Sequence, residues 1–219
     1  MSQAVAKSTR RPATYEDLLA VPPPLVAEIL FGALVTHPRP SPRHARAALR
    51  LGTTLSGPFD LGLNGPGGWV FLPEPELHLG EHIVVPDLAG WRLDRLPQLP
   101  ETAWIEVAPD WVCEVLSPST ESYDRGDKRL IYAEAGVSHV WHINPCLKLL
   151  EVYELTDGKW LLLDVFSDDA RVVAAPFAEF GFSLSLLWSL GPQPSAPSAG
   201  ARARKAAPGK GARKRRPRS

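Results

Sequence analysis

Apolar residues in this chain occur in short runs that are separated by turns rich in proline and glycine. Runs of about four to eight apolar residues, with many β-branched and aromatic side chains, are typical of β-strands. The pattern predicts a strand pair turning at Phe31-Gly32, a long hairpin, a buried strand, and three later strands. Their ranges are 25–36 for the pair, 69–79 with 83–91 for the hairpin, 111–116 for the buried strand, and 137–144, 148–155 and 159–166.

Three other segments predict helices. Thr14 can cap a short helix over 15–20, and Ser41 can cap a longer one over 41–55 that has an apolar side and a basic side. A third helix is expected over 119–135, and Gly136 would end it in a left-handed conformation. This order of elements predicts a mixed α/β (α+β) domain with a central mixed sheet flanked by helices.

The length of 219 residues fits one domain with tails. We expect a flexible N-terminus over 1–13, a folded domain over 14–190, and a disordered basic tail over 191–219. The two cysteines do not make a disulfide framework or a zinc site. The chain shows no signal peptide and no apolar run of membrane-spanning length, so we expect a cytoplasmic protein without membrane contact.

The net charge of zero hides an uneven distribution. Nine Lys or Arg and no acid lie in 201–219, which leaves 24 − 9 = 15 basic against 24 acidic residues in 1–200, a net charge of −9. The tail could attract the phosphate backbone of a nucleic acid. Alternatively, it could fold back and screen the acidic body. Its densest basic run is Arg213, Lys214, Arg215 and Arg216.

Two acids interrupt apolar strands. Asp87 falls on the second strand of the hairpin, and Glu114 lies within the buried strand. A buried carboxylate is costly to ionise unless a cation meets it, and Lys128 on the following helix is a suitable partner. Asp124, Lys128 and Tyr132 lie four residues apart, so they share one helix face. We interpret Asp87, Glu114 and Lys128 as one catalytic cluster.

These residue types suit the hydrolysis of a phosphodiester bond. Asp87 and Glu114 could bind Mg²⁺ or Mn²⁺ through oxygen, and the metal would activate water and polarise a phosphoryl oxygen. Lys128 could orient that water or offset the charge that develops in the transition state. Asp124 could hold the ammonium group in place. The alternative is that Asp124 and Lys128 form an ordinary surface pair, which contributes little stability.

Two further residues remain open to either interpretation. Glu28 lies in the apolar run 25–36; a solvent-facing position on an edge strand is favoured, and a role in the site is the alternative. His44, near the start of the second helix, could face the site or a phosphate. The favoured interpretation of this histidine is a surface or structural residue.

Several spaced motifs, in order, resemble those of one known family. They are Val85-Pro86-Asp87-Leu88, the segment 111–120 (WVCEVLSPST), Asp124 with Lys128 and Tyr132, and the segment 136–145 with Val140-Trp141 and Asn144-Pro145. Over roughly 14–190 the chain resembles the Uma2 family, also called DUF820. Members of this family are described as restriction endonucleases of the PD-(D/E)XK nuclease superfamily.

The resemblance implies a restriction-endonuclease-like fold and assigns roles to the cluster. Asp87 would be the acid of the first motif and Glu114 the acid of the second. The superfamily pattern calls for lysine at the position of Leu116, and the family resemblance implies that this lysine has moved to the next helix, as Lys128.

The activity expected from this resemblance is Mg²⁺-dependent endonucleolytic cleavage of DNA. A homodimer is also expected, because a double-strand break usually requires two active sites. The alternative is a non-catalytic nucleic-acid-binding or regulatory module on the same scaffold.

Overall fold

The larger sheet of the protein has six strands and forms the centre of the fold. The structure is a computed structural model that describes residues 11–191. In spatial order the six strands are β11 (Lys159–Ser167), β10 (Leu149–Thr156), β9 (His139–Asn144), β8 (Trp111–Val115), β6 (Leu88–Arg92) and β3 (Trp69–Pro73). Strands β8 and β9 are parallel, and the other neighbours in this sheet are antiparallel.

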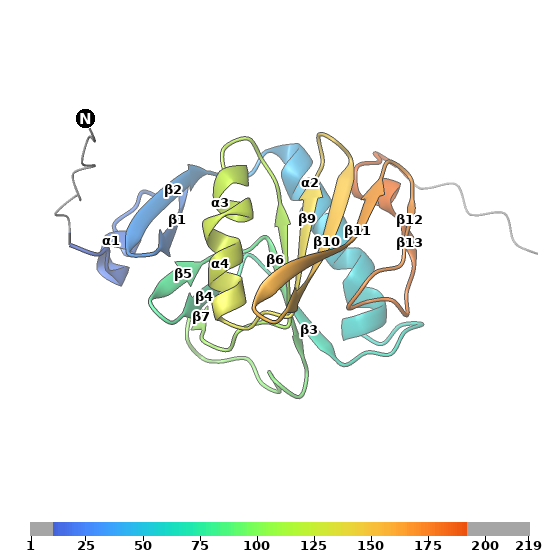
Figure 1. The fold of residues 1–219 in the computed structure, drawn as a ribbon, viewed down its shortest axis with the longest axis horizontal. Helices are drawn as coiled ribbons and strands as arrows, with labels where there is room; N and C mark the ends of the chain where they lie inside the picture. Colours follow the sequence, from blue (N-terminus) through green and yellow to red (C-terminus); the bar gives the residue numbers. More distant parts are fainter. Residues whose placement is uncertain (1–10, 192–219) are drawn as a thin grey trace, which may run out of the picture.

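The second sheet has five strands and lies at the end of the molecule that carries the N-terminal segment (Figure 1). In spatial order its strands are β2 (Ala33–Pro38), β1 (Leu25–Leu30), β5 (His82–Val84), β4 (Glu76–Leu79) and β7 (Trp104–Ile105). Strands β1 and β2 form the predicted hairpin, which turns at Phe31-Gly32. A small pair, β12 (Arg171–Val172) with β13 (Phe182–Ser183), completes the strands of the described residues.

The hairpin predicted over 69–91 is divided between the two sheets. Strands β3 and β6 pair in the larger sheet, whereas β4 and β5 pair in the smaller one. Each arm is interrupted beside a proline, Pro75 in one and Pro86 in the other, because proline has no N–H to give to a sheet. The expectation that Asp87 lies on a strand was therefore wrong: it lies in the break between β5 and β6.

The first two predicted helices are confirmed. Helix α1 (Tyr15–Leu19) starts at Thr14, whose side chain forms a capping box with Asp17. Helix α2 (Pro42–Leu55) starts at Ser41, whose hydroxyl accepts from the N–H of His44. A π-helical turn, Ser56–Asp60, continues α2.

The third predicted helix is two helices, α3 (Glu121–Arg125) and α4 (Asp127–Glu134). They meet at Gly126, whose φ of −104° and ψ of −99° lie outside the helical region. A Cβ atom at this glycine would lie 2.8 Å from the carbonyl oxygen of Ser122, so the bend depends on glycine. Gly136 ends α4 with a φ of 76°, as predicted.

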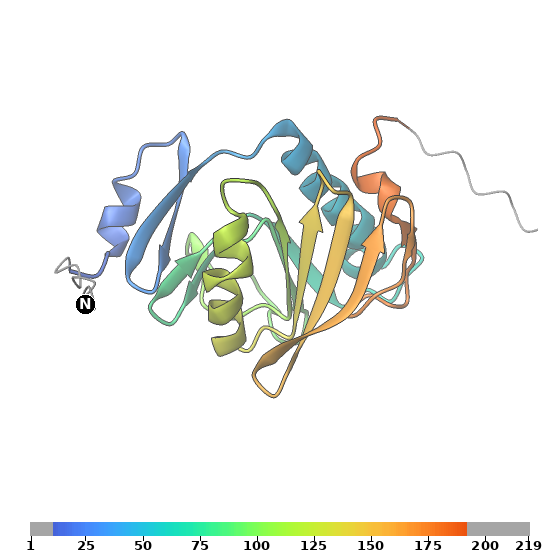
Figure 2. The same ribbon diagram turned by 45° about the horizontal axis from the view of Figure 1, so that its top comes forward.

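The two faces of the larger sheet bury different clusters. Trp111, Cys113 and Trp141 pack with α2 and the segment after β12, whereas Val112 and Val140 pack with α4. Figures 1 and 2 accordingly show α3 and α4 on one face of the sheet and α2 on the other. This architecture confirms the predicted mixed sheet flanked by helices. Because side chains alternate along a strand, it also places Glu114 on the face covered by α4.

Candidate active site

Asp87 is held by two neighbours that come from different elements. Its Oδ2 accepts a hydrogen bond from the backbone N–H of Val115 on β8, at 2.7 Å. Its Oδ1 lies 2.5 Å from Nε2 of His44 on α2. The break after Pro86 therefore turns this carboxylate toward the end of β8 and the start of α2, with both oxygens in hydrogen bonds.

Glu114 lies on β8 and is 2% exposed. Its Oε1 accepts a hydrogen bond from the hydroxyl of Tyr132 at 2.6 Å and lies 2.8 Å from Nζ of Lys128. Burial raises the pKa of the Glu114 carboxyl well above its ordinary value, while the ammonium of Lys128 acts in the opposite direction. The carboxyl is thus buried, and the ammonium group of Lys128 lies beside it.

Lys128 joins three carboxylates. Besides Glu114, its Nζ lies 3.1 Å from Oε1 of Glu28 and 3.5 Å from Oδ1 of Asp124. Burial alone would lower the pKa of this ammonium, but the carboxylates of Glu114 and Glu28 outweigh burial and raise it well above the ordinary value. Asp124 and Lys128 are both buried, so the alternative of a surface pair was wrong.

Glu28 is 1% exposed and belongs to the same cluster, so the favoured solvent-facing position was also wrong. Its Oε1 accepts from the N–H of Val85 at 2.7 Å, and its Oε2 lies 3.1 Å from Nε2 of His37. Burial acts to raise the pKa of this carboxyl, but Lys128, His37 and the Val85 N–H together lower it to about 2. Glu28 is therefore a permanent counter-charge to Lys128.

The sequence analysis did not select His37, although strand geometry could have found it. Glu28 pairs with Val35 across the β1–β2 hairpin, and His37 is two residues further along the same strand. Such diagonal cross-strand neighbours lie within reach of long side chains. Strand β1 is also internal to its sheet, because it lies between β2 and β5, and this explains the burial of Glu28.

His44 is 7% exposed, so a surface position was wrong, whereas its contact with Asp87 is compatible with the structural role that was the other half of that interpretation. The cluster opens into a cavity of about 580 Å³ between the N-terminal hairpin, the start of α2 and the loop after β8. Of the residues singled out from the sequence, five line this cavity: His44, Asp87, Glu114, Asp124 and Lys128. Glu28 and Tyr132 contact these residues from behind the cavity wall.

Comparison with known proteins identifies the family of this chain. The family model of Uma2, described as "Putative restriction endonuclease", matches residues 12–187, which is most of the chain. The chain belongs to the Uma2 family. The resemblance drawn from the sequence motifs is thereby confirmed, and the cluster around Lys128 lies entirely within the matched range.

A solved structure shares the fold of this Uma2 protein. It is a crystal structure described as "a putative nuclease belonging to DUF820" from Anabaena variabilis ATCC 29413, with a TM-score of 0.63 and 24% sequence identity. The match covers 81% of this chain and 98% of that chain. No curated protein matches this chain.

No three His, Cys, Asp or Glu side chains within 11–191 are grouped so that they could hold a metal ion by themselves. No helix in that range is long and apolar enough to cross a membrane. The four tail residues Arg213, Lys214, Arg215 and Arg216 lie outside the described residues.

Proposed function

We propose that this protein hydrolyses phosphodiester bonds in DNA, with Mg²⁺ or Mn²⁺ bound by Asp87 and Glu114. One observation carries the proposal: two carboxylates from different elements line one cavity, and a buried lysine is ion-paired with the second of them. Membership of a family described for restriction endonucleases supports the same class of reaction.

The donor set fits magnesium. Mg²⁺ is a hard cation that usually binds one or two carboxylates and completes its coordination with water and substrate phosphates. Asp87 and Glu114 line this cavity, and they belong to no group of three His, Cys, Asp or Glu within 11–191 that could hold a metal ion by itself, which is compatible with that habit. When bound, the metal would supply Lewis-acid polarisation of a phosphoryl oxygen and lower the pKa of a bound water.

The chain's own residues orient the carboxylates and place positive charge beside them. The Val115 N–H and the His44 ring fix both oxygens of Asp87, so this side chain loses little freedom when it binds a ligand. The Tyr132 hydroxyl does the same for Oε1 of Glu114. Lys128, 2.8 Å from Glu114, would offset negative charge that develops on the phosphoryl oxygens.

The test combines metal binding with cleavage. Calorimetry with Mg²⁺ and Mn²⁺ should show binding to the wild type that Asp87→Asn and Glu114→Gln abolish. The exposed Asp164→Asn on β11 should leave binding unchanged. Plasmid and single-stranded DNA should be cut only with the metal present. Lys128→Met should lose cleavage under conditions where circular dichroism shows that the variant is folded.

A second function has one observation in its favour. Within the described residues, Glu114 Oε1 already accepts from Tyr132 and faces Lys128, so the buried cluster is satisfied without a metal. This would suit a non-catalytic nucleic-acid-binding or regulatory module. Absence of metal binding by the wild type, together with retained DNA binding, would reject the nuclease and favour this module.

We further propose a homodimer, since cutting both strands of a duplex usually requires two active sites. Light scattering should then give twice the chain mass at micromolar concentration. A monomer at that concentration would contradict the dimer. Cleavage of single-stranded DNA would then be tested separately, because it does not require two active sites.

A further inference from the structure

The cavity that holds the proposed active site has an unequal charge balance on its wall. Its charged lining consists of five acids and two permanent cations. The acids are Glu74, Glu76, Asp87, Glu114 and Asp124, and the cations are Lys128 and Arg39. Lys128 is buried and committed to three carboxylates. Arg39 is exposed, and no acid of the described residues lies within ion-pair distance of it.

Arg39 is anchored between two loops. It lies between β2 and α2, and its Nη2 donates to the carbonyl oxygen of Pro23 at 3.1 Å. A guanidinium group has five N–H donors in a rigid fork, so this single bond leaves most of them for another acceptor. The anchor also fixes where the group is held, which lowers the entropy cost of binding an anion.

The start of α2 adds a second positive feature next to Arg39. The helix has 14 residues, and its first turn contains Arg43 and His44 but no acid. The amino-terminal end of such a helix favours anions through its dipole. Its first N–H groups contribute less here, because Pro42 has none and the N–H of His44 already donates to the Ser41 hydroxyl. Ser41 and His44 line the same cavity as Arg39, so the two features face a shared space.

The net charge of residues 11–191 explains why a local positive site would be needed to bind a nucleic acid. Residues 11–191 contain 13 Lys or Arg and 24 Asp or Glu, a net charge of −11. A nucleic-acid strand is repelled by such a body unless local cations meet its phosphates. We propose that Arg39, beside the amino-terminal end of α2, binds the backbone phosphate next to the one that is cut. This subsite rests on the proposed nuclease function and makes Arg39 a substrate-positioning residue.

The first test measures binding without cleavage. A short fluorescein-labelled single-stranded DNA is titrated with the full chain in EDTA, and its anisotropy gives Kd over a range of salt concentrations. Arg39→Ala should raise Kd about tenfold, the effect of one charge-assisted hydrogen-bonded contact. It should also reduce the slope of log Kd against log salt by about 0.7, the value for one phosphate contact on a single strand.

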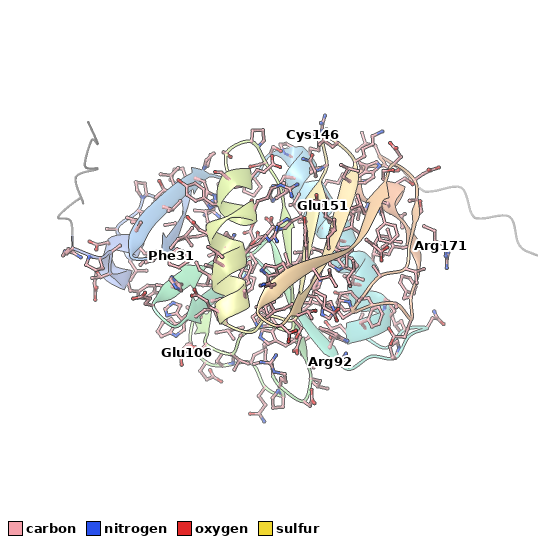
Figure 3. The ribbon with its side chains drawn as sticks, viewed as in Figure 1. Phe31, Arg92, Glu106, Cys146, Glu151 and Arg171 are labelled. Atoms are coloured by element: carbon pink, nitrogen blue, oxygen red, sulfur yellow. The ribbon has the colours of Figure 1, made fainter. Side chains whose placement is uncertain are left out.

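Two variants serve as controls. Arg171→Ala removes an exposed arginine on β12, at the end of the molecule away from β1 and β2, and should leave Kd unchanged (Figure 3). Arg39→Lys keeps the charge but not the planar fork, so it should retain the salt slope and bind with intermediate affinity. If Arg39→Ala and Arg39→Lys have the same melting temperature as the wild type, loss of the Pro23 contact has not unfolded the chain.

The second test uses cleavage with Mg²⁺. Arg39→Ala should raise KM and leave kcat unchanged, because the contact is made equally in the ground state and the transition state. A methylphosphonate at the linkage beside the cut should weaken wild-type binding but cost Arg39→Ala nothing further.

The outcomes separate the two proposals. Cleavage by the wild type with no effect of Arg39 on Kd or KM overturns the subsite alone. Binding that depends on Arg39, without any cleavage, supports the anion subsite and overturns the nuclease. Equal losses in Arg39→Ala and Arg171→Ala, or no DNA binding at all, overturn the subsite.

Discussion

Replacing Lys128 by methionine tests whether the buried cluster is held by charge. The side chains have similar length, so the substitution removes the ammonium group with little change in packing. Lys128 is 2% exposed and faces carboxylates of Glu28, Glu114 and Asp124 at 3.1, 2.8 and 3.5 Å. The variant leaves these acids buried without a cation.

The size of the loss can be worked from one pair. At an effective dielectric constant of about 20, the Lys128–Glu28 pair at 3.1 Å contributes about 5 kcal/mol of attraction. The variant also gains, because it no longer buries an ammonium group. Removing one partner of a buried pair generally costs about 3–5 kcal/mol, and we expect a loss of free energy of unfolding in that range.

Urea unfolding at pH 7, followed by tryptophan fluorescence, measures the loss. With an m-value of about 2 kcal/mol per molar, the midpoint should fall by about 2 M. The control is Lys159→Met on the exposed start of β11, which should change the midpoint little. A loss below about 1 kcal/mol, or one equal to the control, would refute the reasoning that the cluster needs its cation.

The dependence on pH gives an independent check. The pKa of Glu28 is lowered to about 2 in the folded protein, so its stabilising contribution is present above the unfolded value near 4.5 and is lost as the pH falls toward 2. The wild type should therefore lose stability over that range, and the difference from Lys128→Met should shrink. A difference that stays constant down to pH 2 would contradict the assignment of Glu28 as the counter-charge.

Three other predictions concern buried groups near the site. Burial lowers the pKa of His142 to about 3, so the folded state binds fewer protons than the unfolded state between pH 6.5 and 3. The free energy of unfolding should therefore fall by about 1.4 kcal/mol per pH unit on acidification over that range. His142→Gln should flatten this pH profile in urea titrations, and an unchanged profile would contradict the lowered pKa. Tyr132→Phe removes the donor to Glu114 and should cost about 1–3 kcal/mol in the same assay, whereas a neutral result would mean that the carboxyl finds another partner. Gly126→Ala places a Cβ 2.8 Å from a backbone oxygen of α3 and should lower the melting temperature. The control is Gly57→Ala, whose Cβ would have nothing within 4 Å. Equal melting temperatures of the two variants would refute the need for glycine at the bend.

Local chemistry was enough to predict most elements and their ends. Thr14 and Ser41 start their helices as expected, because capping depends on a side chain and the N–H groups two or three residues later. Gly136 likewise adopts the left-handed conformation that ends its helix. The burial of Glu114 within an apolar strand also followed from its immediate neighbours.

Sequence patterns did not predict how separate elements cover one another. The division of the 69–91 hairpin depends on two prolines acting in register, and the bend at Gly126 depends on where α4 must pack. The sequence around Glu28 is typical of an edge strand. Its burial depends on β5, which pairs with β1, and on Lys128, which α4 places beside it.

The sequence by itself therefore determined the strands, the helix starts and the residue types of the cluster. The tertiary structure alone decided that Glu28 and His44 join Asp87, Glu114 and Lys128, which come from 5 different parts of the chain. The physical reason is range. Periodicity and capping report interactions within a few residues, whereas the burial and charge of a side chain depend on distant segments that fold against it.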